Sequence, residues 1–234
     1  MCGRSSLTKT EKEIEARFQA TFYSEELVRY NPIPNFNIAP TQRQAVITMS
    51  DNHQLRIFQW GLIPSWAKDK SIGSKMINAR SETLEEKPAF KRLLPSKRCI
   101  IPLDGYYEWK TQGKSKIPFR IITTDQEIFA VAGLWDQWHN GSELVETFTI
   151  ITIASNTLTA EIHDRMPAIL TKENENHWID EDISGRDAMQ LLLPYPSEHM
   201  KAYQVSDRVN NVRENDASLT QPAKVNVAIQ GELF

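Results

Sequence analysis

Cysteine is scarce in this sequence, because only Cys2 and Cys99 occur among its 234 residues. Two cysteines without CxxC spacing exclude a disulfide framework, argue against a zinc site and fit a reducing compartment. The chain also lacks an apolar run long enough to span a bilayer, and charges throughout its first twenty residues leave no signal-peptide core. We therefore expect a cytoplasmic protein that holds no metal and is not bound to a membrane.

Several common signatures of nucleotide, metal and hydrolase sites are also missing. The sequence contains no GxxxxGK[ST], no GxGxxG after a strand, no HExxH and no GxSxG. Its net charge of −3 means that any binding of nucleic acid must use a local basic patch. Residues 87–98, "KPAFKRLLPSKR", hold five basic residues and no acid, although a solvated surface is the simpler explanation of such a cluster.

The hydrophobic pattern predicts a sheet-rich fold with few helices. Capping-box spacing of Thr10 and Glu13 starts an expected helix within residues 8–22, and two more helical segments are expected around 172–193. Alternating, β-branched and aromatic runs predict strands within residues 44–49, 54–60, 98–110, 116–124, 127–135 and 146–154. Strands and helices do not alternate regularly. We therefore expect one α+β domain over residues 1–219, with an antiparallel, barrel-like sheet core and scattered helices, and a C-terminal tail at 220–234.

Three polar stretches stand out because their neighbours are apolar or aromatic. Glu108 lies between two aromatic residues of an expected strand. Buried there, it would suit proton transfer, although an exposed position on an alternating strand is equally consistent. Asn78 and Arg80 follow a loop, and His163 precedes Arg165 and an apolar run. Taken singly, Asn78 is typical of a turn, and His163 of a loop residue bonded to the backbone.

Cys2 directly follows Met1. Its small side chain predicts that Met1 is removed, which would leave an α-amine and a thiol on adjacent carbons of one residue. No internal cysteine offers that pair. The alternative is that Cys2 is an ordinary terminal residue.

Six stretches occur in a fixed order over residues 1–170: "MCGR", "NIAPTQ", "WGLIPSW", "INARSET", "RCIIPLDGYYEWK" and "HDRMPAIL". As a set they resemble the SOS response-associated peptidase (SRAP) family of abasic-site processing proteins. Residues 184–219 resemble the C-terminal part of the family more weakly, and nothing after Leu219 is assigned.

The resemblance implies that Cys2, freed of Met1, bonds covalently to an abasic site in single-stranded DNA. An α-amine has a pKa of about 7.7–8.0, so part of it is neutral at physiological pH and can attack the ring-opened aldehyde to give a Schiff base. The adjacent thiol then closes a five-membered thiazolidine in an intramolecular step. No cofactor is required. Self-removal of Met1 and strand cleavage as a lyase are further implications.

The resemblance also implies roles for matching positions. Asn78 would orient the N-terminal group and the sugar hydroxyl, Glu108 would shuttle protons, and His163 would assist ring opening and reversal of the crosslink. The positions that match DNA contacts, either to phosphates or as an apolar wedge or stacking surface, are Arg4, Arg80, Arg165, Pro40, Pro64 and Trp66.

Two other functions remain open on the sequence. A non-covalent binder of single-stranded DNA would keep the arginines but would not need Cys2 or Glu108. Class II glutamine amidotransferases also begin "MCG", but they need a glutamine pocket and usually a second synthase domain, for which we expect this chain to be too short. For the DNA-reactive function we expect a monomer whose partner is single-stranded DNA with abasic sites.

Overall fold

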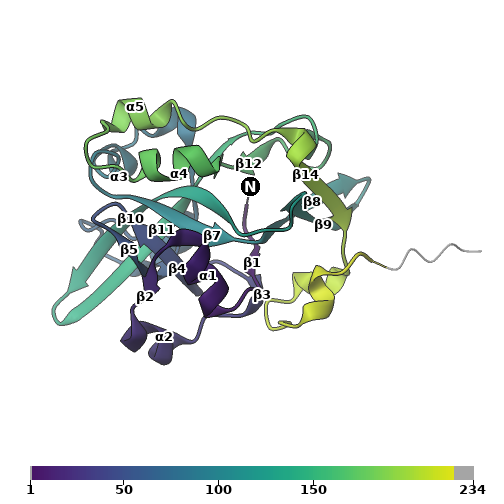
Figure 1. The fold of residues 1–234 in the computed structure, drawn as a ribbon, viewed down its shortest axis with the longest axis horizontal. Coiled ribbons are helices and arrows are strands. Elements are labelled where there is room, and N and C mark those ends of the chain that lie inside the picture. The colour runs from purple at the N-terminus through teal and green to yellow at the C-terminus, as the bar shows by residue number, and fades with distance from the viewer. Residues whose placement is uncertain (1, 224–234) are drawn as a thin grey trace, which may run out of the picture.

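The computed structural model describes residues 2–223, and a closed β-barrel forms its centre (Figure 1). The barrel strands are β4 (Arg43–Thr48), β5 (Asp51–Trp60), β7 (Arg98–Leu103), β10 (Phe129–Asn140) and β11 (Glu143–Ala154). Four of their pairings are antiparallel. A parallel pairing of β11 with β5, which joins Thr147 to Gln59 and Phe148 to Trp60, closes the ring. The predicted α+β fold with a barrel-like, mainly antiparallel core is confirmed.

A second sheet stands beside the barrel, with the strand order β14-β9-β8-β1-β3. Its strands are β1 (Ser5–Leu7), β3 (Asn35–Ile38), β8 (Gly105–Gln112), β9 (Ser115–Thr123) and β14 (Met200–Gln204). Only Asp104 separates β7 of the barrel from β8 of the second sheet. One residue therefore joins β7 of the barrel to β8 of the second sheet, in the stretch where the sequence predicts a bend.

Short strands extend the barrel sheet along β5, β10 and β11. They are β2 (Thr21–Phe22), β6 (Asn78–Arg80), β12 (Arg165–Pro167) and β13 (Ile169–Leu170). β6 runs parallel to β11 just beyond the segment that pairs with β5, and β12 pairs antiparallel with the last residues of β11. Two predicted site segments, 78–80 and 165–167, are thereby brought to the same end of one strand.

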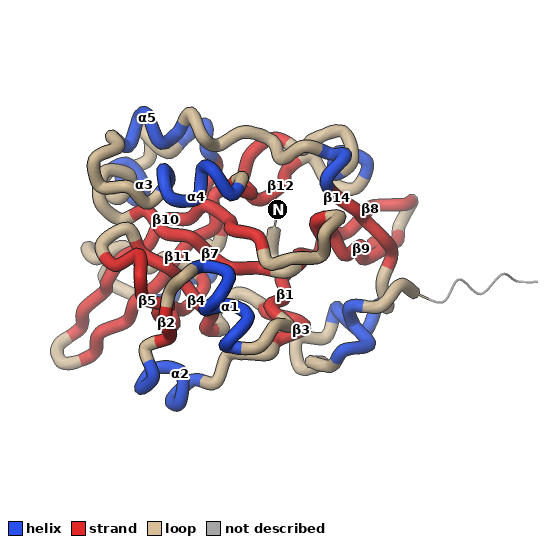
Figure 2. Tube along the Cα trace, in the orientation of Figure 1, coloured by secondary structure: helices blue, strands red, loops and turns tan. Residues whose placement is uncertain are grey.

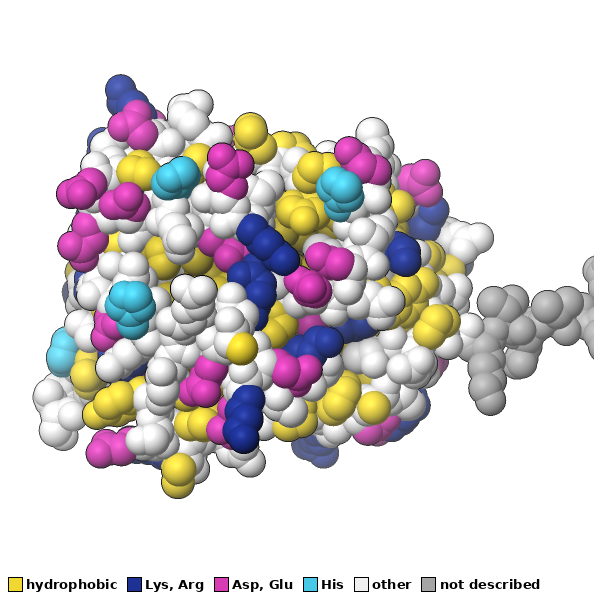
Figure 3. Space-filling model, in the orientation of Figure 1, with side chains coloured by type: hydrophobic (Ala, Val, Ile, Leu, Met, Phe, Trp, Pro, Cys, Tyr) yellow, Lys and Arg dark blue, Asp and Glu magenta, His cyan; other side chains and the backbone are white. Residues whose placement is uncertain are grey.

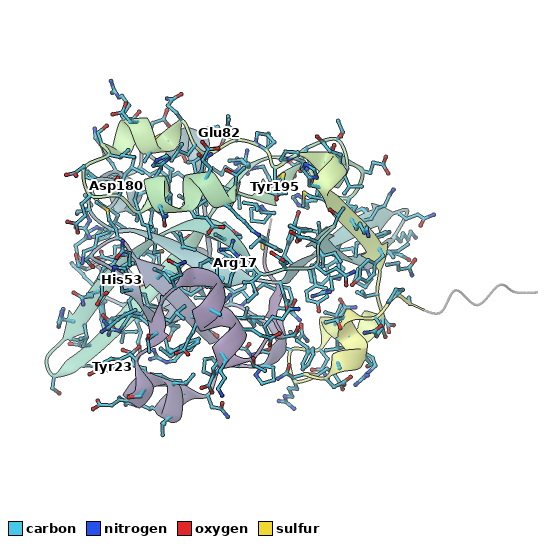
Figure 4. All side chains as sticks on the ribbon, in the orientation of Figure 1. Arg17, Tyr23, His53, Glu82, Asp180 and Tyr195 are labelled. Atoms are coloured by element: carbon cyan, nitrogen blue, oxygen red, sulfur yellow. The ribbon has the colours of Figure 1, made fainter. Side chains whose placement is uncertain are left out.

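The helices are short and lie around the strands (Figure 2). They are α1 (Glu11–Phe18), α2 (Ser24–Tyr30), α3 (Pro88–Lys91), α4 (Lys172–Trp178) and α5 (Gly185–Met189), with 3-10 turns η1 (Lys70–Lys75), η2 (Ser81–Thr83), η3 (Thr159–Glu161), η4 (Ser197–His199), η5 (Asp207–Asn210) and η6 (Ala217–Thr220). The predicted capping box of Thr10 and Glu13 is present at α1. The helix ends at Phe18, earlier than the predicted segment, because Gln19 adopts a left-handed conformation. Arg17 then ties α1 to Glu175 of α4 (Figure 4).

The basic cluster at 87–98 is partly structural. Arg98 is completely buried, and its guanidinium donates to the carbonyl oxygens of Trp178, Leu94 and Ile183. Lys97 lies 3.7 Å from the ring centroid of Trp135. This stretch therefore holds the α4–α5 region on the barrel, and Arg98 is not available to a nucleic acid.

Other expectations about burial agree with the structure. Cys99 is buried in the core, and His53, His139, His177 and His199 are exposed. No described helix combines the length and apolarity needed to cross a membrane. At the C-terminal end, the backbone N–H of Ala223 donates to the carbonyl oxygen of Gln204. The predicted tail lies outside the described residues from 224 onward.

Candidate functional site

Cys2 is fully buried where the barrel meets the second sheet. Asn78, the first residue of β6, donates its Nδ2–H to the carbonyl oxygen of Cys2 at 2.8 Å. On the other side, β1 pairs with β8, so that Ser5 lies opposite Tyr106 and the N–H of Tyr107 bonds to the carbonyl oxygen of Arg4. The beginning of the chain is thus fixed by two elements that are distant in sequence. The predicted loss of Met1 concerns a residue outside the described ones.

Burial dominates the electrostatics of the Cys2 thiol. Burial raises its pKa far above the ordinary value, and the nearby Glu108 carboxylate raises it further, while a hydrogen bond from the backbone of Arg4 lowers it. Glu108 lies on β8 and is only 4% exposed, which settles the question that the sequence left open. The sulfur is therefore a protonated thiol at neutral pH, close enough to Glu108 to be affected by its charge.

His163 lies on the loop before β12, with its side chain 29% exposed. Its Nδ1 is 3.0 Å from the backbone nitrogen of Arg165 and 2.8 Å from Oδ1 of Asp164. One nitrogen cannot accept from the first and donate to the second at the same time. The backbone N–H of Arg165 and the carboxylate of Asp164 therefore compete for one ring nitrogen, Nδ1.

Glu108 and His163 face the same open pocket of about 680 Å³. The rest of its lining consists of Trp109, Thr111, Lys116 and Asn210. Asn210 on η5 accepts a hydrogen bond of 2.8 Å from the indole N–H of Trp109. The arrangement puts a carboxylate, an imidazole, an indole and an ammonium group around one open space.

Sequence reasoning missed Trp109, Asn210 and Lys116. A signal for Lys116 was present, because residues 109–119 contain three lysines and no acid. The hydrogen bond between Trp109 and Asn210 joins positions far apart in the chain, and no local sequence pattern predicts it.

Arg4 is buried within the protein. It is 9% exposed, and its Nη1 donates to Oδ1 of Asn37 at 2.7 Å and to the carbonyl oxygen of Val209. Its guanidinium carbon lies 5.9 Å from the ring centroid of Trp109. Burial lowers the pKa of Arg4. In this structure Arg4 ties β1, β3 and η5 together, and it approaches the pocket only through Trp109.

Arg80 and Arg165 flank the end of β11 in different states. Arg80 is exposed, and its guanidinium makes no hydrogen bond or ion pair with another residue between 2 and 223. Arg165 is held by both carboxylate oxygens of Glu82, one at 2.9 Å, and by the carbonyl oxygen of Thr152. Glu82 lies beside β12 (Figure 4), and the Arg165 hydrogen bonds hold the pKa of Glu82 below its ordinary value. Arg80 is thus available to an anion, and Arg165 is already neutralised.

The three predicted wedge residues lie apart from the Glu108–His163 pocket and do not line it among the described residues. Pro40 is half-buried next to Thr41, whose N–H donates to the carbonyl oxygen of Trp60. Pro64 is buried, whereas Trp66 is 54% exposed with the Arg92 guanidinium 5.9 Å from its ring centroid. Only Trp66 of the three presents a broad ring to solvent.

The surface is of mixed charge. Figure 3 shows Lys and Arg side chains near the middle of one face with Asp and Glu among them. Between residues 2 and 223, no group of three or more His, Cys, Asp or Glu residues is placed so that it could hold a metal ion.

The chain matches the model of the SOS response associated peptidase (SRAP) family over residues 1–212. It is 46% identical over 224 residues to the abasic site processing protein YoaM of Bacillus subtilis (strain 168), and the aligned region covers 94% of this chain and 97% of YoaM. It is 33% identical over 226 residues to the abasic site processing protein YedK of Escherichia coli (strain K12), which covers 95% of this chain and 100% of YedK. A crystal structure of a protein from Bacteroides thetaiotaomicron, 34% identical, superposes with a TM-score of 0.87 over 95% of this chain and 100% of that one.

Proposed function

The chain belongs to the SOS response associated peptidase (SRAP) family, and we propose that it processes abasic sites in single-stranded DNA. Once Met1 is removed, Cys2 would form a covalent thiazolidine crosslink that shields the lesion. The position of Cys2 carries this proposal: it is buried, Asn78 holds its carbonyl oxygen, and Glu108 acts on its sulfur. An ordinary chain end needs none of these contacts.

The α-amine of Cys2 would react first. It attacks C1′ of the ring-opened sugar, a C–N bond forms, and water leaves to give a Schiff base. The thiol, which burial keeps protonated, then adds to the same carbon. An S–C bond forms, the π electrons of the C=N bond move to nitrogen, and that nitrogen takes up the proton of the thiol. Because both nucleophiles belong to one residue, ring closure is intramolecular and fast.

Three side chains would assist these steps. Asn78 fixes the carbonyl group of Cys2, and its Oδ1 is buried without a hydrogen-bond partner among the described residues, so it can accept from the amine or from a sugar hydroxyl. Glu108 borders both the sulfur and the pocket, which suits a carrier of protons. His163 faces the same pocket and would open the sugar ring and reverse the crosslink.

Phosphate binding would rest first on Arg80, because its guanidinium is exposed. Arg165 would have to exchange Glu82 for a phosphate, and Arg4 would act by supporting Trp109. Affinity for single-stranded DNA should fall with salt by a log–log slope of about 0.7 per phosphate contacted. Arg80→Ala should flatten the slope by one contact, and an unchanged slope would remove Arg80 from the binding set.

Pro40, Pro64 and Trp66 would form the apolar surface that stacks beside the missing base. Trp66 supports this role, because its ring is half exposed and carries the positively charged Arg92 at its face. Aromatic side chains stack on bases without sequence preference, which suits a protein that recognises a lesion instead of a sequence.

Two further activities use the same groups. Glu108 and Cys2 would allow self-removal of Met1, and the Schiff base would allow strand cleavage as a lyase. Intact-mass analysis of Glu108→Gln tests the first, because retained Met1 in this variant alone would assign the cleavage to the protein itself. Electrophoresis of the DNA after incubation tests the second.

A denaturing gel tests the main proposal. The protein is mixed with a single-stranded oligonucleotide that carries one abasic site, beside an intact oligonucleotide. We expect a slow band that survives heat, forms only on the lesion, disappears in Cys2→Ala and persists in Cys99→Ala. Cys99→Ala is the matched control, because it removes the other buried thiol of the chain.

Cys2→Ser separates the two chemical steps. It keeps the α-amine and lacks the thiol, so the heat-stable band should vanish while a borohydride-trappable Schiff base forms. If the wild type gives no covalent product although its mass shows that Met1 is absent, the crosslinking proposal fails and non-covalent binding of single-stranded DNA becomes the leading function.

A further inference from the structure

Tyr106 is a buried residue for which the proposed reaction has so far had no use. It lies on β8 and is 0% exposed, and its hydroxyl group has no hydrogen-bond partner among the described residues. A buried hydroxyl without a partner is costly, since the group gives up water and receives nothing in return. Such a group calls for a specific explanation, and a reactive centre next to it is one.

The register of β8 places Tyr106 at the reactive centre. Residues two apart on a strand point to the same face, so Tyr106 shares the face of Glu108. Tyr106 pairs with Ser5, so it lies beside the strand that leads back to Cys2. Tyr106 and Cys2 belong to the same buried hydrophobic cluster. The next residue, Tyr107, faces the other way, and its hydroxyl donates to the carbonyl oxygen of Phe36 at 2.7 Å.

The electrostatics agree with this placement. Burial raises the pKa of Tyr106 far above its ordinary value, and the charges of Cys2 and Glu108 raise it further. The phenol therefore remains protonated and keeps a hydrogen to donate. Near Cys2, it is a neutral donor that adds no charge to the site.

We propose that the Tyr106 hydroxyl is a further catalytic group, which donates a hydrogen bond to the Cys2 sulfur while that sulfur adds to the Schiff base. The inference rests on the proposed function of Cys2. In that step the S–H bond breaks, the S–C bond forms, and the proton passes to the imine nitrogen, by way of Glu108. The hydrogen bond stabilises the negative charge that builds on sulfur before the S–C bond is complete, and the hydroxyl keeps its own proton throughout.

Tyr106→Phe tests this idea by removing one oxygen atom. The substrate is an oligonucleotide with one abasic site. Quenching with borohydride measures the total covalent product, and heating without borohydride measures the heat-stable closed ring alone. We expect the conversion of Schiff base to closed ring to slow about tenfold, the effect of one hydrogen bond to a charged group. The yield of the borohydride-trapped Schiff base should stay at the wild-type level, because its formation needs only the α-amine. Affinity for the intact oligonucleotide should not change.

Tyr107→Phe is the matched control. It removes a hydroxyl that has a partner, so it should lower the unfolding temperature and leave the closure rate unchanged. Tyr106→Phe should not lower the unfolding temperature, because the oxygen it removes has no partner to lose. Closure by Tyr106→Phe at the wild-type rate would overturn the inference while the crosslink itself stands. Absence of any heat-stable product in the wild type would overturn the proposed function, and the inference with it.

Discussion

Replacing Asp104 by alanine should lower the free energy of unfolding more than replacing any exposed charged residue of the protein. Asp104 is 3% exposed at the junction between β7 and β8. Its carboxylate accepts hydrogen bonds from Oγ of Ser6 at 2.6 Å, from the backbone N–H of Thr8 at 2.7 Å and from the hydroxyl of Thr8. It also pairs with Arg120 at 3.1 Å. One carboxylate thus anchors β1 and neutralises a buried cation.

The magnitude follows from what the substitution leaves behind. The Arg120 side chain is 10% exposed, so it would remain buried without its counter-charge. It sits tightly there, because a Cβ on Gly105 would lie 2.7 Å from its Nε. Removing one partner of a buried ion pair costs about 3–5 kcal/mol. A domain of this kind is stable by about 5–15 kcal/mol in total, so Asp104→Ala should remove a large share.

Urea unfolding followed by fluorescence measures this loss. Glu143→Gln is the control, because its ion pair with Lys70 joins side chains that are 46% and 58% exposed. An exposed pair contributes about 0–1 kcal/mol. We also expect Asp104→Ala to form the crosslink more slowly, since β1 positions Cys2. A loss no greater than that of Glu143→Gln would refute the reasoning that Asp104 anchors β1.

Three further predictions concern charge and protonation. Glu82→Gln should raise the affinity for intact single-stranded DNA about fivefold, because it frees Arg165 and removes a charge worth roughly 1 kcal/mol, which fluorescence anisotropy measures. Lys116→Ala should lower the salt slope of the same binding by about 0.7, while Lys70→Ala leaves it unchanged. Burial raises the pKa of the Cys99 thiol, so folding favours its protonated form and stability is lost as pH rises above the unfolded value of about 8.5. Urea unfolding near pH 8 and pH 10 measures this loss. The free energy of unfolding of the wild type should fall between these pH values by about 1.4 kcal/mol per pH unit more than that of Cys99→Ala.

Local patterns predicted the elements of this fold better than their long-range pairing. The capping box at Thr10 and the alternation along β4 and β5 fix local structure, and both are present. The parallel pairing of Gln59 with Thr147, which closes the barrel, has no local signature. It depends on where two distant strands meet after the core has formed. The end of α1 was missed for a different reason, because Gln19 leaves the helix in a left-handed conformation that its residue type does not announce.

The sequence named candidate site residues, but it did not show which of them are buried or which are paired with another side chain. The sequence could not decide whether Glu108 is buried, because an alternating strand allows both faces. Nor could it show that Arg4 is enclosed by Asn37 and Val209, or that Arg165 is held by Glu82. The sequence does not show whether the guanidinium of an arginine is free or already paired with another group of the protein. These pairings are set by tertiary contacts, and they decide which arginine is available to a phosphate.

The alternation of β8 joins stability and chemistry in one strand. Tyr106 and Glu108 turn one face of it toward Cys2, while Tyr107 turns the other toward β3 and bonds to the backbone of Phe36. A shift of one residue would exchange the two faces, so the register of β8 has to be fixed independently of the reactive groups. Asp104 does this at the first residue before the strand, by binding β1 and Arg120 together. The same contact that stabilises the fold therefore determines which side chains face the Cys2 thiol.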